Sequence, residues 1–185
     1  MDDVAALLAL AMARMVEARD GPTHDHSLRI ARLAAGLAER MGLTARRQRV
    51  VRLGGLLHDV GKVAVPDTIL RKPAPLDEAE WAIMSRHPQA GARILRGIPA
   101  LADVVEVVRN HHERWDGTGY PHGLAGEAIP LEARIVAVAD AYAAMTEDRP
   151  YRRGLSPLQA VAEIRAQAGR QFDPAVVASF PFSGR

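Results

Sequence analysis

Two adjacent histidines open the stretch His111-His112-Glu113-Arg114-Trp115-Asp116-Gly117-Thr118-Gly119-Tyr120-Pro121. Successive residues of an α-helix point about 100° apart, so neighbouring histidines can aim at one point only where a helix ends. The glycines and the proline that follow would end a helix here. Because histidine is the commonest metal ligand, the stretch predicts a metal site where a helix passes into a loop. The alternative is a polar loop with incidental histidines.

Helical periodicity extends over most of the chain on both sides of this stretch, and no segment alternates like a strand over more than a few residues. The sequence therefore predicts an all-α fold, a bundle of about seven to nine helices. A proline-rich loop is expected over 63–75. The expected helices cover about 4–16, 25–41, 45–62, 78–86, 87–96, 99–112 and 131–147, and two more begin at Pro157 and Pro174.

The length of 185 residues and a hydrophobic content of 48% suit one domain with a substantial core. We expect a single domain over 1–185, with an N-terminal helix over 1–18 and a catalytic core over 19–182. The apolar residues of the first helix are expected to pack internally, with dimer formation as the alternative. They are Leu7, Leu8, Met12 and Met15.

Composition excludes several classes of protein. The 24 basic residues oppose 22 acidic ones without forming a basic stripe, so no nucleic-acid partner is expected. Cysteine is absent, which leaves only histidine and carboxylate as metal ligands. The first apolar run, 4–12, is too short to span a membrane and lacks the basic start of a signal peptide. We expect a soluble, cytoplasmic protein without a membrane partner.

Most of the candidate metal ligands lie at predicted helix ends. Five of the seven histidines are placed in this way: His26, His58, His87, His111 and His112. His24 and His122 fall in loops, and we expect them not to bind metal. Asp140 interrupts an apolar helix, and a buried carboxylate needs a strong partner. That partner is a metal ion or an arginine such as Arg134 or Arg149.

The order of the motifs resembles a known family. His58-Asp59 with Asp140 is the pattern of the HD phosphohydrolase superfamily. Longer motifs are similar to its HD-GYP subfamily, and the similarity extends from about residue 17 to about residue 180. These motifs are His58–Lys62, Pro66-Asp67 with Lys72-Pro73, His87-Pro88 with Gly91, His111–Pro121, Arg149–Arg152 and Phe172–Pro174.

The resemblance implies a metal-dependent phosphodiesterase that hydrolyses the bacterial messenger cyclic di-GMP to pGpG, GMP or both. It also implies two divalent ions per chain, iron or manganese, with Asp59 between them. One ion would be bound by His26, His58, Asp59 and Asp140, and the other by Asp59, His87, His111 and His112.

The same resemblance assigns roles around these ions. Hydroxide held between the metals would attack phosphorus, and Lys62 would neutralise the phosphate or protonate the leaving oxygen. Arg149 and Arg152 would bind the second phosphate. Tyr120 would shape the substrate-binding loop, which in the family also contacts partner domains such as diguanylate cyclases (GGDEF domains).

Some relatives bind a third metal through a glutamate where this chain has Pro22, so we predict a two-metal site, with Glu17 as a weak substitute ligand. Two alternatives stay open. One is an inactive HD-GYP domain that binds a nucleotide or a partner, and the other is a phosphohydrolase for another nucleotide. Because inactive domains lose ligands and this chain keeps all of them, activity is favoured.

Overall fold

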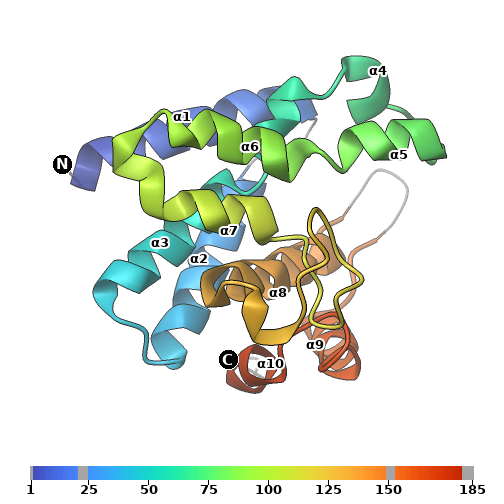
Figure 1. Ribbon diagram of the computed structural model, residues 1–185. Helices are drawn as coiled ribbons and strands as arrows, with labels where there is room; N and C mark the ends of the chain where they lie inside the picture. Colours follow the sequence, from blue (N-terminus) through green and yellow to red (C-terminus); the bar gives the residue numbers. More distant parts are fainter. Residues whose placement is uncertain (1, 21–24, 149–152, 181–185) are drawn as a thin grey trace.

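The computed structural model describes residues 2–20, 25–148 and 153–180 (Figure 1). Within these residues the chain forms helices and isolated β-bridges but no strand, so the all-α prediction is confirmed. The α-helices are α1 (Asp2–Asp20), α2 (His26–Arg40), α3 (Ala45–Leu57), α4 (Asp67–Leu70), α5 (Glu78–Met84), α6 (His87–Arg96), α7 (Val105–Asn110), α8 (Leu131–Thr146), α9 (Pro157–Ala166) and α10 (Pro174–Ser179). The 3₁₀ helices are η1 (Val60–Ala64), η2 (Pro99–Val104) and η3 (Gly126–Ala128).

Local side chains define several helix starts, as the sequence predicts. The Thr44 hydroxyl accepts a hydrogen bond from the first turn of α3. Asp77 and Glu80 form a reciprocal capping box at the start of α5. Ser156 forms a second box with Gln159 at the start of α9. Each cap satisfies backbone N–H groups that have no partner within their own helix.

Three boundaries differ from the prediction. The expected loop over 63–75 contains α4, a single turn of four residues. The helix expected from Pro99 begins as 3₁₀ and becomes α-helical only at Val105. The third helix stops at Leu57, and residues 58 and 59 lead into η1. Such short turns carry no periodic signal over a full helical window. If α4 is set aside, the other nine described α-helices match the upper end of the predicted number.

Helices α2, α3 and α8 pack against one another at the centre of the fold (Figure 1). Helix α6 lies against η1 and α7, and α7 also contacts α3 and α8. Helices α9 and α10 cover the other side of α8. Among the described helices, none combines the length and the apolar character that a bilayer-spanning segment requires.

Helix α1 packs on the body mainly through alanines, and of the four large side chains that we expected there, Met12 packs against the core while being only partly buried. Ala5, Ala9 and Ala13 are almost fully buried, and the helix lies against α3 and η1. Leu7 and Met15 are 66% and 67% exposed. The prediction that these two residues pack internally is therefore wrong. Small residues four apart let the helix axes approach closely, a preference that a hydrophobic pattern alone does not reveal.

A buried ion pair joins α8 to the start of α10, and its arginine also contacts the loop after α7. Arg134 Nη1 lies 2.6 Å from Asp173 Oδ2, and Arg134 Nε donates to the carbonyl of Ile129. The same guanidinium covers the Trp115 ring, 5.6 Å from its centroid. Asp173 is only 3% exposed. Arg134 therefore pairs with Asp173 rather than with Asp140.

Replacing Arg134 with methionine is expected to lower the free energy of unfolding by about 2 kcal/mol, because Asp173 would keep its buried charge without a cation. Urea denaturation followed by circular dichroism measures this loss. The matched control is Arg46→Met, which removes an exposed arginine from its pair with Asp103. This variant should leave the urea concentration at the midpoint of unfolding unchanged. Equal midpoints for the two variants would contradict the role of the buried pair.

Candidate metal centre

The ends of several helices meet at one place beside α8. His26 is the first residue of α2, His87 is the first residue of α6, and His58 and His111 directly follow α3 and α7. Two groups of potential ligand atoms form there, each with its atoms within 4.8 Å of one another. They are His26, His58 and Asp140 in the first cluster, and Asp59, His87, His111 and His112 in the second cluster.

The Asp59 carboxylate lies between the two clusters. Its Oδ2 is 3.2 Å from His58 Nε2, and its Oδ1 is 3.3 Å from His87 Nε2. Lys62 Nζ is 2.9 Å from the same Oδ2. Asp140 lies on the first cluster, with its Oδ1 3.7 Å from His26 Nε2. One oxygen of Asp59 therefore faces each cluster, as a bridging ligand requires.

The backbone orients three of the imidazole rings. The Nδ1 atoms of His58, His87 and His111 each lie 2.8–2.9 Å from the carbonyl oxygen three residues earlier in the chain. Nδ1 therefore carries a proton and donates it, which leaves Nε2 as the atom that offers a lone pair to a metal when the ring is neutral. Within the described structure, the Nε2 atoms of His87 and His111 are buried and have no hydrogen-bond partner. Buried polar atoms of this kind are rare, and a metal ion would satisfy both, so the donor set fits divalent metal.

Sequence analysis missed Glu147, which orients the fourth ring. Its Oε2 accepts a hydrogen bond from His26 Nδ1 at 3.0 Å. This contact directs His26 Nε2 toward Asp140, and a carboxylate behind a ligand histidine is a common support for metal binding. The sequence offered only a weak signal, because Glu147 follows α8 directly, in an extended conformation, and its position is set by the way the chain leaves that helix.

Burial and neighbouring charges set the protonation of the clusters. Burial and the nearby imidazoles hold the pKa of His111 well below its usual range, and they lower the pKa of His112 to about 4. Burial alone would raise the pKa values of Asp59 and Asp140, but the adjacent histidines lower both. Burial opposes the protonation of His58, yet the two carboxylates raise its pKa to about 9. Neutral imidazoles and ionised carboxylates are the forms that bind metal, so His111 and His112 are already in that form near neutral pH, whereas His58 releases a proton when metal binds.

The stretch after His112 folds back over the second cluster. A side chain at Gly119 would lie 2.4 Å from the backbone nitrogen of Arg114, so only glycine allows this close approach. The Tyr120 ring then stacks on His112, with centroids 4.8 Å apart. Burial and the nearby carboxylates raise the pKa of Tyr120, which therefore keeps its phenol proton.

A pocket of about 620 Å³ opens beside the clusters, and His111, His112 and Asp140 form part of its wall. Trp81 of α5 lines the same pocket and meets the Tyr120 ring edge to face, with centroids 5.8 Å apart. Its side chain is half exposed. Sequence analysis also missed Trp81, since a single aromatic residue in a short helix carries no distinctive spacing.

Two acids of the stretch hold the loop rather than a metal. The buried carboxylate of Glu113 accepts hydrogen bonds from the backbone N–H groups of His122 and Leu124. Asp116 accepts bonds from the Thr118 hydroxyl and backbone N–H, which lower its pKa to about 2. Both acids therefore fix the backbone around Tyr120.

Arg149 and Arg152, the predicted phosphate-binding residues, lie outside the residues that the structure describes. So do Pro22 and His24, which were expected not to bind metal. Glu17, the weak candidate for a third metal, belongs to neither described cluster. Its carboxylate instead accepts a hydrogen bond from the backbone nitrogen of Ser27 in the first turn of α2.

The fold and the paired clusters together define a class, an all-helical protein with a histidine and carboxylate centre built at helix ends. A family model described as HD domain matches residues 10–176. The chain belongs to the HD domain family, which confirms the resemblance inferred from the motifs.

The chain is similar to proteins that are named as cyclic dinucleotide phosphodiesterases. It is 44% identical to the cyclic di-GMP phosphodiesterase response regulator RpfG of Xanthomonas campestris, over 90% of this chain and 44% of that protein. It is 43% identical to 3′3′-cGAMP-specific phosphodiesterase 2 of Vibrio cholerae, over 90% of this chain and 32% of that protein. The chain thus spans less than half of either relative.

A solved structure shares the fold. It is the cyclic GMP-AMP specific phosphodiesterase V-cGAP3 of Vibrio cholerae, with a TM-score of 0.72 at 20% identity over 94% of this chain and 47% of that one.

Proposed function

We propose that this chain is a metal-dependent phosphodiesterase that hydrolyses cyclic di-GMP. The observation that carries the proposal is the pair of clusters on either side of Asp59, beside an open pocket, in which the buried Nε2 atoms of His87 and His111 have no hydrogen-bond partner among the described residues. The name of the 44% identical relative supports the same substrate. Linear pGpG, GMP or both are the proposed products.

The proposed metal ligands are the seven residues of the two clusters, with Asp59 shared between two ions. Iron or manganese suits such a nitrogen and oxygen donor set. When bound, the ions would activate water near neutral pH and polarise the phosphodiester. Glu147 would keep His26 in its ligand orientation.

The remaining groups would act on the substrate directly. Lys62, 2.9 Å from Asp59, would neutralise the phosphate or donate a proton to the leaving 3′-oxygen. Tyr120, which stays protonated, would donate a hydrogen bond from the wall of the pocket. Arg149 and Arg152 are proposed to contact the second phosphate. The Gly-Tyr-Pro loop is proposed as the contact surface for diguanylate cyclase domains.

The test uses protein purified without oxygen and loaded with ferrous iron or manganese. Hydrolysis of cyclic di-GMP and metal content are measured on the same sample. Turnover with about two metals per chain is the expected result. Two bound metals without turnover would overturn the proposed activity and favour a binding role.

A second substrate is favoured by one observation, the 43% identical relative named as specific for 3′3′-cGAMP. The two cyclic dinucleotides differ in one base, so the same phosphodiester chemistry would serve both. Parallel assays with equal concentrations of each nucleotide decide between them through the ratio of kcat/KM. A higher kcat/KM for 3′3′-cGAMP would replace cyclic di-GMP as the assigned substrate.

Trp81 is expected to bind a base of the substrate by stacking. Replacing it with alanine should raise KM for cyclic di-GMP by about tenfold while kcat stays nearly unchanged, because stacking on an aromatic ring contributes about 1–3 kcal/mol per base. Trp81→Phe keeps an aromatic face and should restore most of the affinity. Steady-state kinetics on the three proteins measure the effect, and an unchanged KM in Trp81→Ala would exclude stacking at this position.

A further inference from the structure

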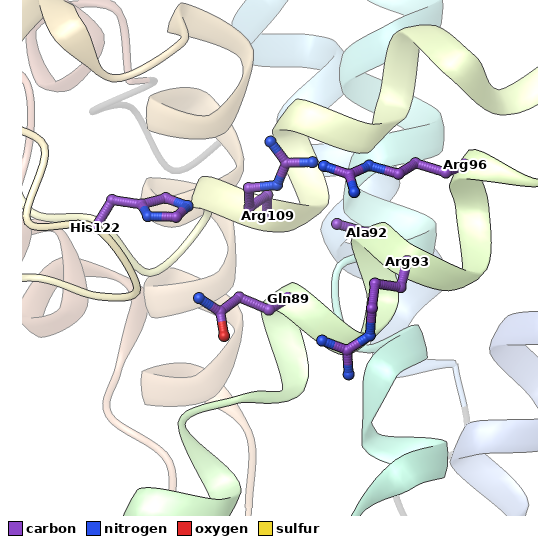
Figure 2. Close-up of a pocket in the computed structure, with 6 residues that line it drawn as sticks. All are labelled: Gln89, Ala92, Arg93, Arg96, Arg109 and His122. Carbon is purple, nitrogen blue, oxygen red and sulfur yellow. The ribbon is translucent and has the colours of Figure 1, made fainter.

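A second hollow, of about 250 Å³, lies between α6, α7 and the loop that carries His122. Figure 2 shows the six residues that line it: Gln89, Ala92, Arg93, Arg96, Arg109 and His122. None of them lines the pocket at the metal centre. The hollow is therefore a separate feature of the surface.

The lining side chains come from elements that are held in place. Gln89, Arg93 and Arg96 recur at helical spacing along one face of α6, away from the face that His87 presents to the second cluster. Arg109 belongs to α7, which packs against α6. His122 is held through its backbone N–H, which donates to the buried Glu113 carboxylate at 2.7 Å. The packing of these elements therefore forms the hollow before any ligand binds.

Positive charge in the hollow exceeds the negative charge around it. Arg109 pairs with Glu106, at 2.7 and 3.0 Å from its two oxygens. Among the described residues, Arg93 and Arg96 take part in no ion pair with an acid. In Figure 2 the guanidinium groups of Arg96 and Arg109 point toward one another. The Arg93 side chain lines the same hollow but extends away from the other two in Figure 2, so two guanidinium groups, those of Arg96 and Arg109, converge opposite one carboxylate. Like charges directed at one another in this way favour an anion between them.

We propose that this hollow binds a phosphate group. Guanidinium groups match phosphate oxygens in pairs, and the Gln89 amide and the His122 imidazole add further hydrogen-bonding groups. A hollow of about 250 Å³ is smaller than the usual pocket for a drug-sized ligand, so it suits free phosphate or the phosphate of a monoester rather than an entire cyclic dinucleotide. The bound group neutralises Arg93 and Arg96, which no acid of the described chain does.

Calorimetric titration with inorganic phosphate tests the site, and adenosine 5′-monophosphate is titrated in parallel to distinguish a nucleotide from the free anion. The wild-type chain should bind phosphate with a Kd of about 1 mM. The double variant Arg93→Gln/Arg96→Gln should weaken this binding at least about tenfold. Both side chains are exposed and unpaired, so the variant should fold normally. Arg40→Gln, an exposed arginine of α2, is the matched control and should bind like the wild type.

Nuclear magnetic resonance locates the bound anion, because phosphate in the hollow should shift the side-chain amide signal of Gln89 in the wild type and not in the double variant. Tighter binding of the nucleotide, lost in the double variant, would identify a nucleotide phosphate as the ligand. Equal phosphate affinity in the wild type and the double variant, or no binding by the wild type, would overturn the proposal. These measurements use binding alone, so they are independent of the proposed phosphodiesterase activity.

Discussion

Replacing Asp59 with asparagine is expected to reduce the hydrolysis of cyclic di-GMP by on the order of 10³-fold and to remove metal from the second cluster. In that cluster Asp59 is the only carboxylate, since the other members are His87, His111 and His112. The first cluster keeps Asp140 as an anionic ligand. An amide has the same shape as the carboxylate but no charge, so loss of metal should be selective for the second cluster.

Metal content per chain and the turnover rate, measured on the same anaerobic preparation, give the two readouts. Asp67→Asn is the matched control, because it removes a carboxylate from α4 that pairs with Arg19 at the surface, outside both clusters. The control should retain both metals and full turnover. A variant Asp59→Asn with undiminished metal content and activity would show that Asp59 does not bridge the two ions.

Replacing Gly61 with alanine is expected to lower the free energy of unfolding by more than about 3 kcal/mol. A Cβ atom at Gly61 would lie 1.9 Å from the carbonyl oxygen of His87 and 2.4 Å from the backbone nitrogen of Gly91. Both atoms belong to the backbone of α6, which cannot rotate away as a side chain can. The helix would have to move away from η1, and His87 would leave the second cluster with it.

Chemical denaturation followed by circular dichroism measures this loss. Gly36→Ala is the matched control, because Gly36 lies inside α2 and an added Cβ would meet nothing within 4 Å. That substitution should stabilise the protein by about 0.5–1 kcal/mol, since alanine favours the helix. Equal stability of Gly61→Ala and the wild type would mean that η1 and α6 are not packed as closely as described.

The metal centre depends on packing across the whole chain. Its ligands lie at the ends of α2, α3, α6 and α7 and within α8, so no single segment can form it alone. Each ring has its own local support, a backbone carbonyl for His58, His87 and His111 and the Glu147 carboxylate for His26. Local contacts therefore orient the ligands, and helix packing sets the distances between them.

The sequence alone was sufficient for features that depend on neighbouring residues. Helix starts at Thr44, Asp77 and Ser156 follow from side chains that bond their own first turn. The end of α7 beside two adjacent histidines follows from helix geometry and from the glycines after them. The family follows from the order of its motifs along the chain, and the matched family model confirms it.

Only the tertiary structure could decide features that depend on residues far apart in the chain. Glu147 reaches His26 across 121 positions, and Trp81 meets Tyr120 across a loop and three helical segments. The inner face of α1 is built mainly from Ala5, Ala9 and Ala13, which let the helix approach α3 and η1 closely. The basic hollow combines α6, α7 and a loop. In each case the contact is set by the way whole helices pack, and periodicity along one helix contains no information about its neighbour.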